Sequence, residues 1–364
     1  MDVKLFEQLL GASVQAGTSD IHIKAGSPLM IRDQGEIVPV MDERLSLKDV
    51  ELIVSRLLER AATSPGSQVN LDKLSEIRDY DCSYSLGGVG RFRVNVYRQR
   101  GSLAVTMRII PSKIPTIKDL LLPEVLNEIA VEPRGMVLVT GTTGSGKSTT
   151  MAAMLNHVNM TRTRKIITVE DPIEFLIPDG SSFLSQREVG GDTESFAKAL
   201  RAALRQDPDV IMLGEMRDRE TIEIALKAAE TGHAVISTLH TADAEGTISR
   251  LVGAFDLSQQ EAVRLRLSDS IKAIVSQRLL PRKDGDGRIG AVEIMRMTTT
   301  IRERIISGDN RGFNEFIEKG WNPYQMQTFD QHMIKLIHND LITEQTGLAA
   351  ASSPTNFKRA LKYE

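Results

Sequence analysis

A glycine-rich segment that ends in lysine, serine and threonine contains the residue types best suited to chemistry. Residues 141–149 read Gly-Thr-Thr-Gly-Ser-Gly-Lys-Ser-Thr and follow an apolar run at 136–140. Glycines at these spacings let backbone N–H groups turn towards phosphate oxygens, and the lysine can then reach the β- and γ-phosphates. An apolar strand before the loop and a helix over 149–158 after it are the context that this motif requires. The complete pattern disfavours a plain glycine-rich turn and predicts a site for a nucleoside triphosphate.

The expected nucleotide contacts in this segment come from backbone amides, hydroxyl groups and one ammonium group. We expect Lys147 to act on the transferred phosphoryl group as well as to bind it, and Ser148 to be the protein ligand of Mg²⁺. The loop residues assigned to nucleotide binding are Thr142, Thr143, Gly144, Ser145, Gly146, Lys147, Ser148 and Thr149.

A glutamate at the end of a second apolar run is the main catalytic candidate. Residues 210–214 predict a buried strand, and Glu215 follows it, where a carboxylate could orient water or accept a proton. Many enzymes with such a phosphate loop carry an aspartate directly before this glutamate to hold Mg²⁺ through water, whereas this chain has Gly214. The carboxylates around the metal must then come from the acidic segment at the end of another strand. In that segment we assign Glu170 to cofactor binding and Glu174 to catalysis. A solvated acidic turn is the alternative for this segment.

Two histidines flank a third apolar run, at 234–239. His240 follows this run and could sense the γ-phosphate or contact the next subunit, so we assign it to catalysis. His233 precedes the run and is assigned to the nucleotide site or a subunit interface, with a structural histidine as an equal alternative. No histidines have metal-ligand spacing. The remaining histidines are expected on the surface or in the core: His22, His157, His332 and His338.

Composition and charge are those of a globular enzyme. The 364 residues include 45 basic and 48 acidic side chains, which give a net charge of −3, and only 4% are aromatic. Direct nucleic-acid binding is therefore not expected, because neither a strong positive charge nor a base-stacking platform is evident. A single cysteine, Cys82, excludes an internal disulfide framework and a four-cysteine zinc site. The absence of a signal peptide and of a long apolar run favours the cytosol.

A proline-punctuated stretch at 111–123 divides the sequence into two expected domains. Residues 1–110 predict a small α+β domain, with an opening amphipathic helix and a second helix that begins at a capping box over 46–49. The predicted strands of this domain are 19–23, 29–33, 36–40, 79–86, 91–98 and 103–110, and the last three form an antiparallel meander.

Residues 124–364 predict a doubly wound α/β domain. Apolar runs at 166–170, 210–214 and 234–239 alternate with helical stretches, and ligands gather at the carboxyl ends of such strands. Beyond about residue 257 the pattern favours helices. The capping boxes expected there are 258–261, 300–303 and 328–331.

The combination of motifs resembles the secretion ATPases of type II secretion and type IV pili. The phosphate loop, the acidic segment at 167–175, the Gly-Glu pair and the histidine box at 232–241 carry this resemblance. Within the family, the sequence is most similar to the pilus retraction ATPases of the PilT and PilU type, over almost the entire chain. Assembly motors carry a further N-terminal domain and usually a four-cysteine module, and this chain has room for neither.

The resemblance implies a PAS-like N-terminal domain joined to a RecA-like P-loop NTPase domain with a helical C-terminal lobe. It further implies a homo-hexameric ring that binds ATP and Mg²⁺ between the two domains and acts on an inner-membrane pilus platform protein. The chain would then sit at the cytoplasmic face of that membrane through its partner only. Arg93 and Arg108 match the family arginines that reach the triphosphate, whereas Arg91, Arg98 and Arg100 fit solvated strand arginines.

One segment departs from the family pattern and leaves alternatives open. The retraction signature Ala-Ile-Arg-Asn-Leu-Ile-Arg-Glu corresponds to 300–307 here, where only Ile301, Arg302 and Ile305 are retained. The chain could therefore be the main retraction motor, an accessory paralogue, or a nucleotide-regulated switch with little turnover. The segment could also be a plain amphipathic helix.

Overall fold

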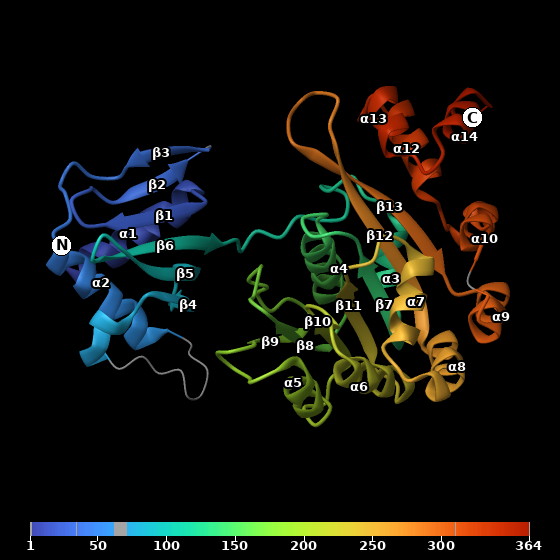
Figure 1. Cartoon of the computed structure of the whole chain (residues 1–364), viewed down its shortest axis with the longest axis horizontal. Helices are drawn as coiled ribbons and strands as arrows, with labels where there is room; N and C mark the ends of the chain where they lie inside the picture. The colour runs from blue at the N-terminus through green and yellow to red at the C-terminus, as the bar shows by residue number, and fades with distance from the viewer. Residues whose placement is uncertain (1, 34, 62–70, 310, 364) are drawn as a thin grey trace. The chain divides into compact units, whose positions relative to one another are not determined.

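The structure is a computed structural model that describes residues 2–33, 35–61, 71–309 and 311–363. The chain divides into two compact units, and in Figure 1 most of the first is coloured blue to teal and most of the second green to red. The first unit contains Met1–Lys113 together with Glu170–Pro178 and Arg187–Ser195, and the second contains the rest. The two units are described separately below.

The first unit is built on a six-stranded sheet with the strand order β3-β2-β1-β6-β5-β4. Neighbouring strands of this sheet are antiparallel, and the predicted meander is confirmed as β4, β5 and β6. Helix α2 packs against β1, β4 and β6, and its capping box between Ser46 and Asp49 is confirmed. The elements are α1 (Val3–Ala16), β1 (Asp20–Lys24), β2 (Met30–Asp33), β3 (Glu36–Pro39), α2 (Leu47–Arg60), η1 (Leu71–Glu76), β4 (Asp79–Leu86), β5 (Gly90–Gln99) and β6 (Ser102–Ile110).

Alternation along the meander strands separates the core of this unit from its polar face. On β5, Phe92, Val94 and Val96 are fully buried and contribute to the core, whereas Arg93 between them is exposed. This two-residue period is expected of a strand with one face on the core. The outward-facing side chains of β5 and β6 are therefore not part of the hydrophobic core and can take part in binding.

The second unit is built on a seven-stranded sheet with the strand order β13-β12-β7-β11-β10-β8-β9. Neighbours from β12 to β8 are parallel, and every residue of β7, β10 and β11 is buried. Such strands read as continuous apolar runs because both faces of the sheet are covered. The elements up to β11 are α3 (Val125–Ala130), β7 (Gly135–Thr140), α4 (Lys147–Thr161), β8 (Lys165–Glu170), β9 (Phe183–Glu188), α5 (Phe196–Ala203), β10 (Val210–Leu213), α6 (Arg219–Glu230) and β11 (Ala234–Leu239).

The expectation of a helical chain beyond about residue 257 is wrong for 271–296. Two long strands lie there, β12 (Ile271–Pro281) and β13 (Arg288–Arg296), and they pair as an antiparallel hairpin. Asp-Gly-Asp-Gly at 284–287 is the turn signal that marks this hairpin, with both glycines at positive φ. The hairpin extends the sheet next to β7.

Helices lie before and after the hairpin, and their starts correct two of the expected capping boxes. Helix α8 has no side-chain cap, and Thr298, not Thr300, caps α9. The box at Thr328–Gln331 is confirmed. Figure 1 shows the helices that follow the hairpin in orange and red. The remaining elements are α7 (Ala244–Gly253), η2 (Leu257–Gln259), α8 (Gln260–Ser270), α9 (Thr299–Ser307), α10 (Phe313–Lys319), α11 (Trp321–Tyr324), α12 (Phe329–His338), α13 (Glu344–Ala350) and α14 (Pro354–Tyr363).

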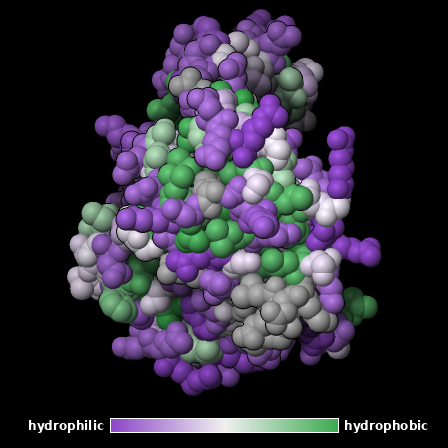
Figure 2. Space-filling model, turned by 90° about the vertical axis from the view of Figure 1, so that its left-hand side faces the viewer, coloured by the Kyte–Doolittle hydropathy of each residue, from purple (hydrophilic) through white to green (hydrophobic). Residues whose placement is uncertain are grey.

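The surface carries apolar side chains among charged ones. Figure 2 shows hydrophobic side chains gathered near the middle of one face, with hydrophilic side chains around them. The exposed large apolar residues of the first unit are Leu5, Ile37, Leu47 and Leu52. Across the described part of the chain, no helix is both long and apolar enough to cross a bilayer.

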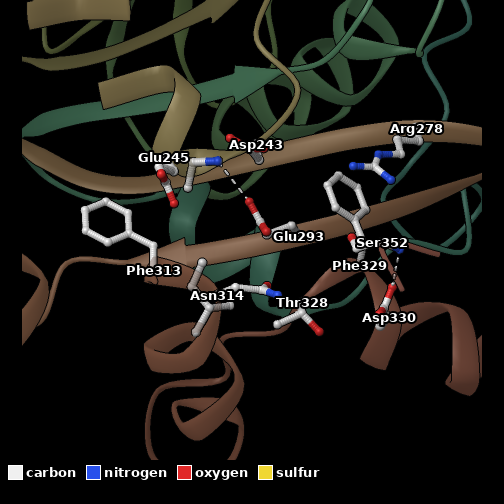
Figure 3. Close-up of a pocket in the computed structure, with 12 residues that line it drawn as sticks. Asp243, Glu245, Arg278, Glu293, Phe313, Asn314, Thr328, Phe329, Asp330 and Ser352 are labelled. Carbon is white, nitrogen blue, oxygen red and sulfur yellow. Dashed lines mark hydrogen bonds between the residues drawn. The ribbon is translucent and has the colours of Figure 1, made fainter. Parts of the chain in front are cut away.

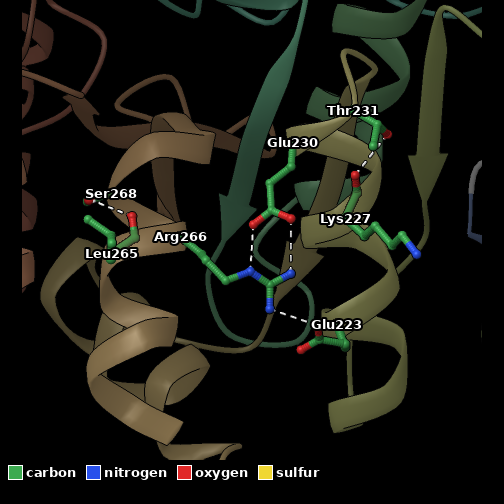
Figure 4. Close-up of polar contacts among 7 residues, drawn as sticks. All are labelled: Glu223, Lys227, Glu230, Thr231, Leu265, Arg266 and Ser268. Carbon is green, nitrogen blue, oxygen red and sulfur yellow. Dashed lines mark hydrogen bonds and ion pairs between the residues drawn. The ribbon is translucent and has the colours of Figure 1, made fainter.

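A single arginine ties together two helices of the second unit (Figure 4). Arg266 on α8 donates from Nε and Nη2 to the carboxylate of Glu230, at 2.6 and 3.1 Å, and from Nη1 to Glu223 at 2.7 Å. The hydrogen bonds to Glu230 and then Glu223 raise the pKa of the Arg266 guanidinium further above its ordinary value. Because both glutamates lie on α6, the contact fixes α8 to α6.

We predict that Arg266→Ala lowers the free energy of unfolding by roughly 1–2 kcal/mol, because it removes a two-carboxylate network that is partly shielded from solvent. Denaturant unfolding of the whole chain would measure the change. Arg311→Ala is the control, since Arg311 is 89% exposed and pairs only at the surface. Equal effects of the two substitutions would show that the network does not stabilise the helix pair.

Candidate nucleotide-binding site

The loop between β7 and α4 has a backbone that excludes side chains at two glycines. Gly141 has φ 147° and Gly146 has φ 87°, values that favour glycine. A Cβ atom on Gly141 would lie 2.4 Å from the carbonyl oxygen of Gln277, and one on Gly146 would lie 2.8 Å from Nε2 of the same residue. The sequence requirement for glycine here thus comes from the close approach of β12.

Lys147 and Ser145 give this loop its polar lining. The ammonium group of Lys147 donates to the carbonyl oxygens of Gly141 at 3.0 Å and Thr142 at 2.9 Å, so the side chain folds back over the loop. Ser145 Oγ is buried and has no hydrogen-bond partner among the described residues. A buried hydroxyl without a partner is costly unless a ligand satisfies it.

These features fit a bound triphosphate. Thr142, Thr143 and Gly144 are exposed at the tip of the loop, while the N-terminus of α4 directly follows Gly146 and favours an anion. Ser148 lies half-buried in the first turn of α4, where a hydroxyl can reach a metal held by phosphates. Within the described ranges no three acidic, histidine or cysteine side chains cluster as a metal site. A single hydroxyl ligand such as that of Ser148 suits Mg²⁺, which usually takes few protein ligands beside phosphates and water.

Glu215 and His240 are brought together at the end of two neighbouring strands. Glu215 follows β10 and has a side chain only 11% exposed, and its Oε2 lies 3.5 Å from Nε2 of His240. Arg217 Nε lies 2.6 Å from the same oxygen. The backbone N–H of Met216 donates to Thr238 on β11, which fixes the segment after β10 against the end of β11.

Strand register places His240 beside the phosphate loop and His233 away from it. Leu239 on β11 is opposite Thr140 on β7, so His240 and Gly141 both follow at the same sheet edge. His233 precedes the other end of β11, and its Nδ1 lies 3.0 Å from the carbonyl oxygen of Ala228. Within one chain, the structure therefore does not bring His233 to the loop, and its ring makes the contacts of a structural histidine.

The acidic segment follows β8, the strand that pairs with β10. Val169 on β8 is opposite Leu213 on β10, and β8 ends at the buried Glu170. Glu174 is exposed in the segment Glu170–Pro178 that belongs to the first unit. The assignment of Glu170 and Glu174 to the metal and to catalysis stays a prediction.

Arg93 and Arg108 are direct neighbours in the first unit. They lie opposite each other on β5 and β6, and both are exposed. Arg108 Nε donates to Asp20 Oδ1 at 2.9 Å. Although burial acts to raise the pKa of Asp20, hydrogen bonds from Ser19 and Arg108 outweigh it and lower this pKa. Arg93 and Arg108 carry two positive charges and Asp20 carries one negative charge, so this group of side chains keeps a net positive charge. The two guanidinium groups repel each other across the strands, and an anion bound between them would reduce that repulsion.

Two of the other strand arginines are structural and not solvated. Arg91 has a side chain 14% exposed and lies 3.1 Å from the carboxylate of Glu188. Arg98 donates to the carbonyl oxygens of Ile77, Gly101 and Leu74. The expectation that Arg91 and Arg98 are solvated is wrong, because backbone carbonyls and a buried carboxylate hold them.

A cavity of about 240 Å³ adjoins the phosphate loop and was not predicted. Gly146 and Thr149 line it from the loop side, and both apolar and polar or charged side chains line the rest. Its size and mixed lining suit the base or ribose of a nucleotide. The lining residues outside the loop include Leu121, Leu122, Gln277, Leu279, Arg282 and Ile289. The leucine run at 120–122 and the Asp-Gly turn at 284–287 were the only signals for it in the sequence.

Comparisons with known proteins agree with this geometry. The family model described as "Type II/IV secretion system protein" matches residues 91–340. The chain is 41% identical to the type IV pilus retractation ATPase PilT of Pseudomonas aeruginosa, covering 96% of this chain and 99% of that protein. It is 36% identical to the type IV pilus ATPase PilU of the same organism, over 98% of this chain and 91% of the relative.

The fold is shared with a solved structure of the same kind. The crystal structure of the pilus retraction motor PilT with bound ADP matches with a TM-score of 0.81 and 44% identity, covering 97% of this chain and 98% of that one. The expected α/β fold is thereby confirmed. With the family model matching more than two thirds of its residues, the chain belongs to the type II/IV secretion ATPases and is similar to their pilus retraction members.

Proposed function

We propose that this chain is a Mg²⁺-dependent ATPase that works as a ring of six copies and powers retraction of a type IV pilus. The observation that carries the ATPase is the meeting of the phosphate loop, Glu215 and His240 at one edge of the sheet. Retraction is proposed from the similarity to PilT and PilU along nearly the whole chain.

The phosphate loop between β7 and α4 binds and aligns the nucleotide. When bound, Mg·ATP supplies the phosphoanhydride bond to be broken and a cation that offsets phosphate charge. Lys147 would exchange its two carbonyl contacts for phosphate oxygens, and Ser145 would gain a hydrogen-bond partner. Ser148 would hold the metal, and Glu170 is proposed to support its binding. The cavity beside Thr149 takes the base and ribose.

Hydrolysis falls to Glu215. Its carboxylate accepts a proton from the attacking water or orients that water, while Arg217 and His240 restrict the positions of the carboxylate. His240 also follows β11 at the sheet edge where the loop begins, and its ring is proposed to respond to the presence of a γ-phosphate. Glu174 is proposed as a second carboxylate for the same reaction.

Arg93 and Arg108 supply positive charge to the triphosphate. Their exposure and their opposition across β5 and β6 support this role, because a bound anion relieves the repulsion between them. Arginine suits it, since its guanidinium keeps its charge and binds phosphate with two parallel hydrogen bonds.

The proposed place of action is the cytoplasmic face of the inner membrane, where the ring would act on the pilus platform protein. No direct nucleic-acid contact and no membrane insertion of this chain are proposed. Exposed apolar residues such as Leu47 and Leu257, 59% and 87% exposed, would be covered between copies or by the partner.

An accessory retraction paralogue is the second candidate, and α9 is the observation that favours it. Ile301 and Ile305, which match the family's retraction signature, are fully buried, and the retained Arg302 forms an ion pair with Asp269. The positions that differ include the exposed Glu303 and Ile306. The packing face of this helix is therefore conserved relative to the signature, while its outward face is altered. Complementation of a strain that lacks its retraction motor would separate the two candidates, since only a main motor restores retraction alone.

We predict that Glu215→Gln lowers kcat for ATP hydrolysis roughly 100- to 10,000-fold, because the amide cannot accept the proton of water. The dissociation constant for ATP should change little, since the loop is intact. Steady-state phosphate release and nucleotide titration would measure the two quantities. Glu220→Gln, an exposed change on α6, is the control and should keep the parent rate. Turnover by Glu215→Gln at the parent rate would refute the assignment.

We predict that Arg93→Ala and Arg108→Ala each lower kcat/KM for ATP by roughly 10- to 100-fold, because a charge-assisted hydrogen bond to phosphate is lost. Arg78→Ala is the matched control, since Arg78 is an exposed arginine of the same unit. If all three variants behave alike, Arg93 and Arg108 are surface residues without contact to the nucleotide.

A further inference from the structure

A buried carboxyl group on β13 lies behind the candidate site. Glu293 is 5% exposed, and its Oε1 accepts hydrogen bonds from the backbone N–H of Ala244 at 2.9 Å and from Ser276 Oγ at 3.3 Å. It forms no ion pair with any side chain in the described part of the structure. A buried acid held only by neutral donors is unusual, because burial without a counter-charge disfavours ionisation.

Hydrogen bonds connect Glu293 to the strand that carries the phosphate loop. Thr140 on β7 is opposite Ser276 on β12, and Ser276 is opposite Glu293 on β13, so the three residues form a row across the sheet. Thr140 Oγ1 donates to Ser276 Oγ at 3.1 Å. Because Thr140 directly precedes Gly141, this row ends at the base of the loop.

The other contact of Glu293 reaches the histidine segment. Ala244 is the first residue of α7, and Asp243 caps that helix by accepting from the N–H of Gly246. His240 lies only four residues before Ala244. The amino end of a helix attracts a negative charge, so an ionised Glu293 would hold the start of α7, and with it the His240 segment, against the sheet.

A cavity of about 160 Å³ lies beside this carboxyl group (Figure 3). Figure 3 shows Glu293 below Asp243, with Asn314 and Thr328 of the C-terminal region on the opposite side. The titratable and charged groups that line the cavity with Glu293 are Asp243, which caps α7, Glu245 from α7, Arg278 from β12 and Asp330 from α12.

The surroundings of Glu293 raise the pKa of its carboxyl group, so both the protonated and the ionised form are populated near neutral pH. Burial raises the pKa of Glu293 to about 7, and the neighbouring Asp243 adds to this effect. The N–H of Ala244, the hydroxyl of Ser276 and the charge of Arg278 oppose it. A change of protonation therefore changes how strongly Oε1 accepts its two hydrogen bonds, since charged acceptors bind about twice as strongly as neutral ones.

We infer that Glu293 is a positioning residue for ATP hydrolysis, which in its ionised form holds the His240 segment beside the phosphate loop. The inference rests on the proposed ATPase function. Protonated Glu293 holds the N–H of Ala244 less firmly, so His240 is less well placed against Glu215, which it contacts in the resting structure. Binding of the nucleotide should depend little on this group, because Lys147 and Ser148 are not in contact with it.

The test is the pH dependence of kcat and KM, measured from about pH 5.5 to about pH 8.5 on the whole chain. The parent protein should show a kcat that rises several-fold through an inflection near neutral pH. Glu293→Gln, which imitates the protonated form, should have the low kcat at every pH and no such inflection, with KM close to the parent value. A merely structural role would lower stability without removing the inflection.

Two further variants keep the test decisive if Glu293→Gln folds poorly. Ser276→Ala removes one donor to the carboxylate, so the inflection should move to higher pH. Glu303→Gln removes an exposed carboxyl on α9 and should leave the profile unchanged. An inflection that Glu293→Gln keeps, or that Ser276→Ala does not move, overturns the inference. A parent protein without turnover overturns the proposed function, and this inference with it.

Thermal unfolding tests the titration of Glu293 without any turnover. In the unfolded chain this group titrates near 4.5, and in the folded chain its pKa is about 7, so the parent loses stability as pH rises between these values. The Tm of Glu293→Gln relative to the parent should therefore be higher at pH 8 than at pH 5. An equal difference at both values would show that Glu293 does not titrate in this range and would contradict the inference.

Discussion

The parallel register of β7, β11 and β10 is the constraint on which the candidate site depends. Thr140 is opposite Leu239, and Leu213 is opposite Ser237, so the chain leaves all three strands at one edge of the sheet. The phosphate loop, His240 and Glu215 therefore meet although they are far apart in sequence. Their strands are buried on both faces, which makes a slip in register costly and fixes the geometry.

The β12–β13 hairpin is the second support of the site. Gln277 on β12 packs under the phosphate loop so closely that Gly141 and Gly146 admit no side chain, and its Oε1 accepts from Thr150 Oγ1 at 2.7 Å. Its neighbour Ser276 connects β7 to Glu293. The hairpin also carries apolar residues such as Ile289 and Ala291 that pack with the C-terminal helices. One pair of strands thus joins the nucleotide loop to the C-terminal helices α12 and α14.

The sequence predicts the loop, Glu215 and His240 because each rests on a local pattern, an apolar strand that ends in a polar residue. It does not predict the hairpin, since the apolar runs of β12 and β13 also suit buried helices, and the Asp-Gly turn at 284–287 is the only local sign of it. His233 and His240 flank the same apolar run, so the sequence offers both as site residues. The six residues of the strand between them place the two histidines roughly 20 Å apart. The burial of Glu293 could not be predicted either, because a buried acid has no sequence pattern of its own.

The central claim is that the chain is an ATPase whose activity belongs to a ring. The most direct test is ATP turnover per chain, measured against protein concentration with the mass of the particles determined in the same samples. We predict that turnover per chain rises in step with particles of six chains, and that Lys147→Ala forms the same particles without turnover. Constant turnover per chain in particles of one chain, or particles of six chains that bind ATP without hydrolysing it, would contradict the account.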